Sequence, residues 1–340
     1  MAAVLVPIAV VGVTGLVFGI GLSIAARKFA IQIDPRVSRI LALLPGANCA
    51  ACGFAGCAGY AEAVVAGKAP PNACVPGGAK VAAQIAEVMG VAATAADPVM
   101  AVVHCKGGKA EAVSRSSYAG LGDCNAAVLA GNGPKVCQEG CLGLGTCVAV
   151  CPFDAIHVNA NGVAVVDPEK CTGCGRCVKA CPRKIISLIP AAHKIYLACS
   201  NHDRGAKVKK YCSVGCTACT LCVKNTPSGA ITMDNNLPRL DYSATENFIV
   251  AANKCPSKCF VDLVKKRPVA NIDTKCDGCG ACVPACPVKT IGGVIGARHE
   301  IDKAKCIGCG LCVGVCPAKA ISMWGGLGYG AGEGSTRRMA

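Results

Sequence analysis

The sequence has few aromatic and few charged residues. Phe, Trp and Tyr make up 4% of its 340 residues, and Asp, Glu, Lys and Arg make up 16%. A large aromatic core is therefore excluded. The chain also lacks a Rossmann glycine fingerprint, a P-loop, a Cys-x2-Cys-His haem motif and a nucleophile paired with a base. These absences exclude a complete nucleotide site and covalent catalysis within this chain.

Cysteine, by contrast, is abundant. The chain has 29 cysteines with 41 glycines and 19 prolines, a composition typical of loop-rich proteins held together by metal rather than by a large apolar interior. Disulfides would need an oxidising compartment. Many of the cysteines are spaced Cys-x2-Cys, which suits metal ligation better. The length predicts two or three domains.

Two cysteine runs of one form lie between Cys276 and Pro317. Each reads Cys-x2-Cys-x2-Cys-x3-Cys-Pro. In an iron–sulfur protein with two such runs, the three thiols on one glycine-containing loop ligate one cluster, and the fourth thiol ligates the cluster of the other run. Zinc sites also use Cys-x2-Cys, but two complete runs favour [4Fe–4S] clusters, and the stretch resembles a bacterial two-cluster ferredoxin. The predicted sets are Cys276, Cys279, Cys282 and Cys316, and Cys306, Cys309, Cys312 and Cys286.

The N-terminal residues 2–26 contain no charged side chain. About 20 apolar residues are enough to cross the hydrocarbon layer, so the run predicts one transmembrane helix. A cleaved signal peptide is the alternative, but it would have basic residues before the apolar run. Basic residues instead follow it, which predicts a single-pass protein of the cell membrane with the cysteines on the cytoplasmic side. They are Arg27, Lys28, Arg36 and Arg39.

Four cysteines near the predicted anchor have the spacing x2, x4 and x16. Together they can close one [4Fe–4S] cluster, with a short helix predicted over Tyr60–Ala66 between them. The set is Cys49, Cys52, Cys57 and Cys74. The motif resembles the small four-cysteine iron–sulfur domain of the Rnf complex B subunit and of some corrinoid proteins. Residues 79–103 are rich in Ala and Val at helical spacing, and predict a pair of packed helices.

The next block contains one altered run and one intact run. In the altered run Leu144 replaces the middle cysteine, and Cys137, four residues upstream of Cys141, is predicted to fill the vacancy. If it does not reach, a three-iron cluster would result. The Asn161-Gly162 turn between residues 155–158 and 163–166 predicts a hairpin. The predicted sets are Cys137, Cys141, Cys147 and Cys181, and Cys171, Cys174, Cys177 and Cys151.

A third block is degraded. Thr226 stands where its first run should have a fourth cysteine, and its second run keeps only Cys255, before Pro256. Residues 260–272 are predicted to be a basic, apolar linker. The crossover pattern leaves one complete set, Cys216, Cys219, Cys222 and Cys255, with Cys212 in place of Cys255 as the alternative.

Five cysteines remain without an assigned role. We expect Cys105 and Cys124 to be small buried apolar residues, and His104 to be structural. The complete sets require 24 cysteines and predict about six [4Fe–4S] clusters, whose usual work is one-electron transfer. The unassigned residues are Cys105, Cys124, Cys199, Cys212 and Cys259.

The predicted fold is α+β, with tandem ferredoxin-like modules after the helix and the four-cysteine domain. Its predicted domains are a transmembrane anchor (1–28), a four-cysteine [4Fe–4S] domain (29–95), a two-cluster ferredoxin-like module (96–190), a degenerate one-cluster module (191–265), a C-terminal 2[4Fe–4S] ferredoxin domain (266–323) and a flexible tail (324–340).

The formal net charge of +15 does not predict nucleic acid as a partner. The basic residues are scattered and are not interleaved with aromatic residues. The formal count also omits thiolates. A [4Fe–4S] cluster with four thiolates carries a charge of roughly −2, so several clusters would cancel most of the excess.

Across almost its whole length, the chain resembles the B subunit of the Rnf complex. The resemblance rests on the anchor, the four-cysteine domain and the Gly-Cys-Leu-Gly-Leu-Gly-Thr-Cys-x3-Cys-Pro-Phe block at residues 140–153. It implies a subunit of a translocase, a membrane-bound ferredoxin:NAD+ oxidoreductase that pumps Na+ or H+. Soluble ferredoxin would be the electron donor, and the other subunits A, C, D, E and G would be partners, with flavin and nicotinamide sites on other subunits.

The chain departs from that pattern by its degraded third block and its additional C-terminal ferredoxin. We expect electrons to enter at the C-terminal ferredoxin and to leave at the cluster held by Cys49–Cys74, near the membrane. Two alternatives are an Rsx-type reductase of a redox-sensing regulator and a polyferredoxin subunit of a hydrogenase or corrinoid system.

Overall fold

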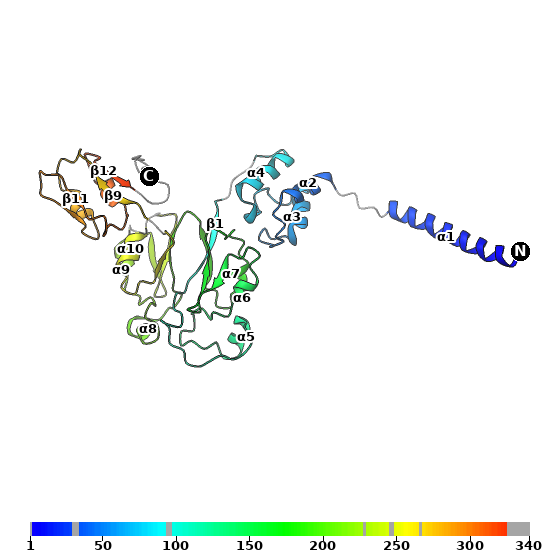
Figure 1. Ribbon diagram of the computed structural model, residues 1–340, viewed down its shortest axis with the longest axis horizontal. Helices are drawn as coiled ribbons and strands as arrows, with labels where there is room; N and C mark the ends of the chain where they lie inside the picture. Colours follow the sequence, from blue (N-terminus) through cyan, green and yellow to red (C-terminus); the bar gives the residue numbers. More distant parts are fainter. Residues whose placement is uncertain are drawn as a thin grey trace. The chain divides into compact units, whose positions relative to one another are not determined.

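The computed structural model describes residues 2–28, 34–92, 97–226, 229–244, 248–264 and 267–324. The chain divides into two units, residues 1–96 and 97–340, and each is described by itself (Figure 1). Short helices and two-stranded sheets give the α+β fold that the sequence predicts. The glycine-rich tail after Trp324, predicted to be flexible, lies outside the described residues.

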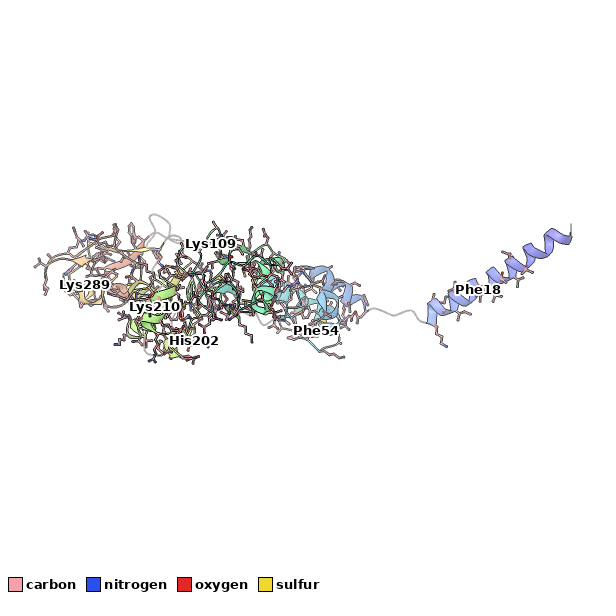
Figure 2. The ribbon with its side chains drawn as sticks, turned by 90° about the horizontal axis from the view of Figure 1, so that it is seen from below. Phe18, Phe54, Lys109, His202, Lys210 and Lys289 are labelled. Atoms are coloured by element: carbon pink, nitrogen blue, oxygen red, sulfur yellow. The ribbon has the colours of Figure 1, made fainter. Side chains whose placement is uncertain are left out.

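The first unit begins with a long apolar helix, α1 (Ala2–Lys28). Its segment Val10–Lys28 is long and apolar enough to cross a membrane, and none of that segment is buried. Large apolar side chains point away from the helix, and Phe18 is 72% exposed (Figure 2). Since a helix that is apolar all round needs an apolar environment, α1 favours membrane association.

The rest of the first unit is a small helical domain around three buried residues. Ile40, Tyr60 and Ile85 are almost fully buried, and the Tyr60 hydroxyl donates to the Pro70 carbonyl oxygen at 2.9 Å. The helix predicted over Tyr60–Ala66 is confirmed as part of α3. The elements are α2 (Pro35–Leu43), α3 (Gly56–Val65), η1 (Val75–Gly77) and α4 (Gly78–Met89).

The predicted helix pair over 79–103 is wrong in its second half. Helix α4 ends at Met89, where Gly90 adopts a left-handed conformation with φ 67°. Val99–Val103 instead form strand β1, which pairs antiparallel with β4 (Ile186–Pro190). A five-residue apolar run is too short to distinguish a buried strand from a helix, and the partner strand lies far away in the sequence.

The second unit repeats one arrangement of strands three times. In each module the first strand pairs with the last, and the two middle strands form a hairpin. We call the modules A (β1 to β4), B (β5 to β8) and C (β9 to β12).

Short helices alternate with these strands. Module A adds α5 (Cys124–Leu129), α6 (Thr146–Ala149), β2 (Ile156–Val158), β3 (Ala164–Val166) and α7 (Arg176–Ala180). Module B has β5 (Ile195–Leu197), α8 (Gly205–Tyr211), α9 (Leu221–Lys224), β6 (Ile231–Asp234), β7 (Leu237–Leu240), α10 (Ile249–Lys254) and β8 (Phe260–Asp262). Module C has β9 (Val269–Ile272), α11 (Cys282–Ala285), β10 (Ile291–Gly292), β11 (Glu300–Ile301), α12 (Leu311–Gly314) and β12 (Ile321–Trp324).

The hairpin predicted around Asn161-Gly162 is confirmed. Strands β2 and β3 pair from Ile156 opposite Val166, and Gly162 has φ 74° in the turn. The linker predicted over 260–272 is wrong at both ends, because β8 pairs with β5 and β9 pairs with β12. The apolar residues of that segment serve two neighbouring modules as their outer strands.

Thiols are part of the hydrophobic cores. In module A, Cys141, Cys147 and Cys177 are buried together with Ile156 and Ile186. Modules B and C likewise bury Cys216 and Cys222, and Cys282 and Cys312. The cores are small, so the cysteines and the space that they surround make up a large part of the interior of each module.

Candidate metal centres

One cavity in module A is lined by the four cysteines of a predicted set. Cys151, Cys171, Cys174 and Cys177 surround a space of about 340 Å³. The loop from Cys171 to Cys177 turns through Gly173 (φ 70°) and Gly175 (φ 73°), and Cys177 lies in the first turn of α7. A side chain at Gly173 would overlap the Val99 carbonyl oxygen of β1. Glycine therefore lets this loop lie against the outer strand.

The second cavity of module A differs from the prediction in one cysteine. It also measures about 340 Å³, and its cysteines are Cys124, Cys141, Cys147 and Cys181. Cys137 does not line it. The structure thus brings Cys124, rather than Cys137, to the vacancy that Leu144 leaves in the run.

Contacts between α5 and α6 hold Cys124 at this cavity. Asp123 caps α5 by accepting a hydrogen bond from the Ala126 amide at 2.9 Å. Its other carboxylate oxygen accepts from the Thr146 hydroxyl at 2.9 Å, and that hydroxyl accepts from the Cys124 amide at 2.7 Å. The sequence analysis took Cys124 for a buried apolar residue. The available signal was Asp123, a strong N-cap residue directly before it.

Cys137 lies in a different cavity, with three of the cysteines left unassigned by sequence. Cys105, Cys137, Cys199 and Cys212 line a space of about 400 Å³ between modules A and B. Cys105, which was also expected to be a small apolar residue, lies two residues after the end of β1. Neighbouring His104 is structural, as predicted, because its ring nitrogens hydrogen-bond to Leu197 O and Ser187 Oγ, both at 2.6 Å.

Module B brings its predicted set together. Cys216, Cys219, Cys222 and Cys255 line a cavity of about 300 Å³. Cys212, the alternative fourth ligand, does not line it. Thr226, at the position of the missing cysteine, donates its hydroxyl hydrogen bond to the Cys222 carbonyl oxygen at 2.6 Å.

Cys259 also lines the cavity of module B, and its role was open in the sequence. Its Sγ lies 3.3 Å from the Cys255 Sγ. A hydrogen bond from the Cys259 thiol lowers the pKa of Cys255 to about 6, and the same contacts raise the pKa of Cys259 itself. Cys259 therefore shares a hydrogen bond with the predicted ligand Cys255.

The C-terminal and N-terminal sets are also brought together. In module C, Cys286, Cys306, Cys309 and Cys312 line a cavity of about 310 Å³. Burial raises the pKa of Cys282, and Cys276, Cys279 and Cys316 are close enough to raise it further. In the first unit, burial and the nearby thiols Cys57, Cys49 and Cys52 raise the pKa of Cys74.

Backbone amides donate to several of the sulfur atoms. In three of the Cys-Pro segments the amide four residues after the cysteine donates to its Sγ, as from Ala155 to Cys151 at 3.4 Å and from Ala320 to Cys316 at 3.3 Å. The Ala101 amide of β1 donates to Cys171 at 3.3 Å. Hydrogen bonds to sulfur stabilise thiolate charge and tune the potential of a bound iron–sulfur cluster.

Burial works against the thiolate form. Burial and neighbouring thiols raise the pKa of Cys147 to about 12, of Cys177 to about 11 and of Cys312 to about 12. These thiols are neutral at pH 7 in the absence of a cation. Bound iron must therefore displace their protons, since metals are held by the thiolate.

The donor sets fit a [4Fe–4S] cluster better than a single metal ion. All 29 cysteines are unbridged. Among the described residues, no group of three or more His, Cys, Asp or Glu side chains is arranged to hold a metal ion. Thiolates about 2.3 Å from a tetrahedral zinc would have to lie roughly 4 Å from one another, an arrangement that the cysteine sets among the described residues do not adopt.

Comparison with known families locates iron–sulfur domains in the same places. A family model for an Fe–S cluster domain matches residues 44–76. Two models for a 4Fe–4S dicluster domain match residues 134–188 and 275–320. The chain is thus an iron–sulfur protein with multiple 4Fe–4S clusters, distributed between its first unit and modules A and C.

Whole-protein relatives cover most of the chain. The B subunit of the Na(+)-translocating ferredoxin:NAD(+) oxidoreductase complex of Acetobacterium woodii is 45% identical over 76% of this chain and 77% of its own length. The proton-translocating counterpart of Clostridium ljungdahlii is 42% identical over 78% and 93%. The B subunit of the ion-translocating oxidoreductase complex of Methanosarcina acetivorans is 37% identical over 86% and 99%.

Proposed function

We propose, since this chain belongs to the family of B subunits of ion-translocating oxidoreductase (Rnf) complexes, that it is the electron-relay subunit of a membrane-bound ferredoxin:NAD+ oxidoreductase. The observation that carries the proposal is the succession of four-cysteine cavities through modules A, B and C. Bound [4Fe–4S] clusters supply one-electron transfer. The partners are soluble ferredoxin as donor and the other complex subunits A, C, D, E and G.

We assign six ligand sets, of which four are supported by a cavity and two by the cysteine spacing and the proximity of the thiols. They differ from the sequence prediction only in that Cys124 replaces Cys137. The sets are Cys49, Cys52, Cys57 and Cys74; Cys124, Cys141, Cys147 and Cys181; Cys151, Cys171, Cys174 and Cys177; Cys216, Cys219, Cys222 and Cys255; Cys276, Cys279, Cys282 and Cys316; and Cys286, Cys306, Cys309 and Cys312.

The chain's own residues perform three tasks at these sites. The cysteines hold iron, the apolar side chains around them exclude water, and the amides that donate to sulfur set the stability of the thiolate charge. No side chain is required to transfer a proton. These tasks are those of an electron-transfer subunit, and the chemistry of the nicotinamide takes place on other subunits.

Module C is the proposed entry point for electrons from ferredoxin. Cys279 and Cys219 are the exposed cysteines among the 29, and an exposed ligand brings a cluster close to an external donor. Lys275 and Lys289 of the same module are exposed, and they can attract an acidic ferredoxin (Lys289 is labelled in Figure 2). We place the exit at the Cys49–Cys74 site, which of the six sets is the nearest in sequence to the membrane helix.

Helix α1 is proposed to be a single membrane-spanning helix of the cell membrane. Arg27 and Lys28 end it, and Arg36 and Arg39 follow. The positive-inside rule then places the cluster modules on the cytoplasmic side. Relatives named for Na+ and for protons are about equally similar to this chain, so either ion fits as the coupling ion.

Rapid mixing of reduced ferredoxin with the purified complex tests the function and the entry point together. Cys279→Ser should slow the first phase of ferredoxin oxidation about tenfold or more, which corresponds to an increase of roughly 1.4 kcal/mol in the activation free energy. Cys219→Ser, which alters the other exposed cysteine, should leave that phase intact and slow only steady-state NAD+ reduction. An unmodified complex that does not oxidise ferredoxin would contradict the function. An unchanged first phase in Cys279→Ser would contradict only the entry point.

A further inference from the structure

Four cysteines that the regular runs do not use converge on one cavity. Cys105 follows β1, Cys137 precedes the first run of module A, Cys199 follows β5, and Cys212 is the C-cap residue of α8. They line a space of about 400 Å³, compared with about 300–340 Å³ for the cavities around four of the ligand sets already described. By the same measure, the space resembles the other cysteine cavities in size as well as in its lining.

We infer that Cys105, Cys137, Cys199 and Cys212 hold a seventh [4Fe–4S] cluster at the junction of modules A and B. The site itself rests on the geometry of these residues. Its role as a step in a relay rests on the proposed function. Of the 29 cysteines, only Cys259 then stays outside a ligand set.

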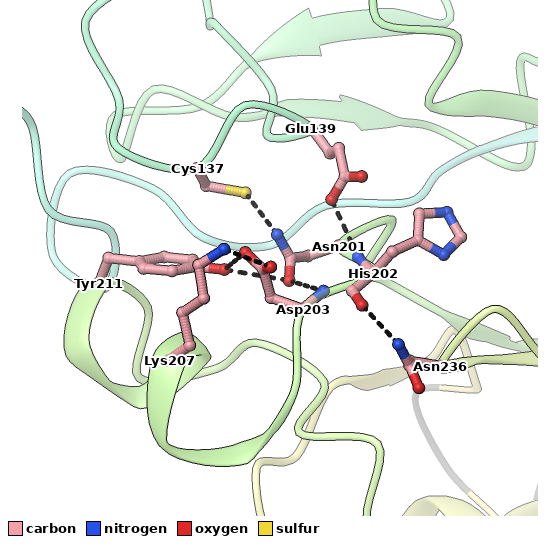
Figure 3. Close-up of polar contacts among 8 residues, drawn as sticks. All are labelled: Cys137, Glu139, Asn201, His202, Asp203, Lys207, Tyr211 and Asn236. Atoms are coloured by element: carbon pink, nitrogen blue, oxygen red, sulfur yellow. Dashed lines mark hydrogen bonds and ion pairs between the residues drawn. The ribbon is translucent and has the colours of Figure 1, made fainter.

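The sulfur of Cys137 has a buried hydrogen-bond donor. The Nδ2 of Asn201 lies 3.6 Å from the Cys137 Sγ, and Asn201 is 5% exposed (Figure 3). The Oδ1 of Asn201 accepts from the Asp203 amide at 2.9 Å, which fixes the side-chain amide with its NH2 group toward the sulfur. The orientation suits a charged sulfur, because an NH2 group offers hydrogen atoms and no lone pair.

A second layer of contacts holds Asn201 in place. The Tyr211 hydroxyl lies 3.1 Å from the Asn201 Oδ1 and donates to the Asp203 carboxylate at 2.6 Å. Lys207 pairs with the same carboxylate at 2.7 Å. Beside Cys137, the Glu139 carboxylate accepts from the His202 amide at 3.0 Å (Figure 3). Asn201 is thus held at the wall of the cavity by a network of hydrogen bonds and an ion pair.

Two other sulfurs accept hydrogen bonds from ligands of the neighbouring sites. The Cys141 amide donates to the Cys105 Sγ at 3.3 Å, and the Cys216 amide donates to the Cys199 Sγ at 3.3 Å. Cys141 belongs to a ligand set of module A, and Cys216 belongs to the set of module B. The inferred site is therefore linked to a ligand of each neighbouring site by one hydrogen bond from that ligand's backbone amide to a sulfur atom. It thus connects the two modules.

A buried cation lies in the same wall. Lys135 is 7% exposed, lines the cavity, and donates to the Gly107 carbonyl oxygen at 2.7 Å. Among the residues that the structure describes, it forms no ion pair with a carboxylate. A buried ammonium group needs an opposite charge, and a [4Fe–4S] cluster with four thiolates carries roughly −2. Four neutral thiols would leave Lys135 without compensation.

Iron and acid-labile sulfide measured per chain test the inference on the anaerobically purified full-length protein in its complex. The unmodified chain should contain about 28 iron atoms, since each cluster contributes four. Cys199→Ser and Cys212→Ser should each lose about four iron and four sulfide. Ala230→Ser is the control, because Ala230 is buried in the same module and lines none of the five cavities described, and it should lose none.

Paramagnetic resonance spectra of the reduced protein separate this site from its neighbour. Cys137→Ser should remove the same spectral component as Cys199→Ser, and Cys124→Ser should remove a different one. Asn201→Leu should keep all iron and shift the midpoint potential of that component downward, because a hydrogen bond to sulfur is lost. This variant keeps the inference testable even if a cysteine variant fails to assemble.

Three outcomes would overturn the inference. They are unchanged iron in Cys199→Ser, a zinc atom recovered in place of four irons, and loss of the same component from Cys137→Ser and Cys124→Ser. About 24 iron atoms with normal ferredoxin oxidation would refute the site and leave the proposed function standing. About 28 iron atoms without ferredoxin oxidation would do the reverse.

Discussion

Modules A and B share one arrangement of strands but fill its interior differently. When Cys181-Pro182 is aligned with Cys255-Pro256, Phe248 stands where module A has Cys174, and Ala251 stands where it has Cys177. Both replacements are about 1% exposed, and the Phe248 ring packs edge-on against Tyr242 at 5.6 Å. The comparison teaches that this fold requires a filled interior, which either a metal cluster or an aromatic side chain can supply.

The cysteine loops of the two modules differ in the same way. Module A uses Gly143 and Gly145 in its first run, with φ 72° and 83°. Module B has Ala218 and Thr220 at those positions, with φ 55° and 61°. The left-handed conformation costs a residue other than glycine about 1–2 kcal/mol. The loop shape that presents three thiols is therefore kept in module B even where the residues oppose it.

Removing iron should separate the modules most strongly. A structural metal contributes on the order of 10 kcal/mol to small domains, so chelation under anaerobic, reducing conditions should lower amide protection in β2–β3 by at least about 100-fold. Strands β6–β7 of module B, which pack on Phe248 and Tyr242, should lose less. Hydrogen exchange of the full-length protein measures both. Equal losses would mean that the aromatic core does not replace a cluster.

Truncating the aromatic replacement should have the next largest effect. Phe248→Ala removes a buried ring and should lower the free energy of opening of module B by about 3–5 kcal/mol. Exchange of the β6–β7 amides reports it. Leu221→Ala is the control in the same module, since Leu221 is 39% exposed, and its effect should stay below about 1 kcal/mol. Similar values for the two variants would contradict the proposed packing role.

A side chain in the loop of module A should have a moderate effect. Gly173→Ala forces a left-handed residue and a contact with the Val99 carbonyl oxygen, at a cost of about 2 kcal/mol or more. We expect faster iron loss from module A and weaker protection of β1–β4. Gly314→Ala has open space around it and no positive φ, so it serves as the neutral comparison. If the variant loses iron no faster than the unmodified protein, a close approach of the loop to the strand would be contradicted.

Relieving the loop of module B should have the smallest effect, and a stabilising one. Thr220→Gly removes the cost of φ 61° and should raise the free energy of opening by about 1 kcal/mol. Thr217→Gly, at a position of ordinary φ, should instead destabilise the module by about 0.5–1 kcal/mol. Exchange at α9 distinguishes the two. Destabilisation by both changes would mean that Thr220 is not strained.

The exact cysteine runs made most of the metal centres predictable. Wherever a run keeps its spacing and its Cys-Pro end, as at Cys276–Cys286, local geometry places three thiols together and sends the fourth to the partner run. The hairpin of module A was predictable for the same reason, because Asn161-Gly162 determines the turn locally.

The remaining features depend on contacts between distant segments. Cys137 is closer in sequence to the vacancy at Leu144, but the contact of Asp123 with Thr146 brings Cys124 there. Strand β1 is defined by its pairing with β4, about ninety residues later. The cavity of Cys105, Cys137, Cys199 and Cys212 draws on four segments and two modules, so no local spacing could indicate it.

The pairing of first with last strands has a consequence for biosynthesis. In modules A, B and C alike, the opening strand finds its partner only after the closing strand has left the ribosome. At 5–20 residues per second, the roughly ninety residues from β1 to β4 take about 5–20 s to synthesise. During that interval the nascent thiols of module A are uncovered. Because the order of the strands leaves these thiols uncovered during synthesis, we expect assembly of the module to require little oxygen in the cytoplasm and prompt delivery of iron.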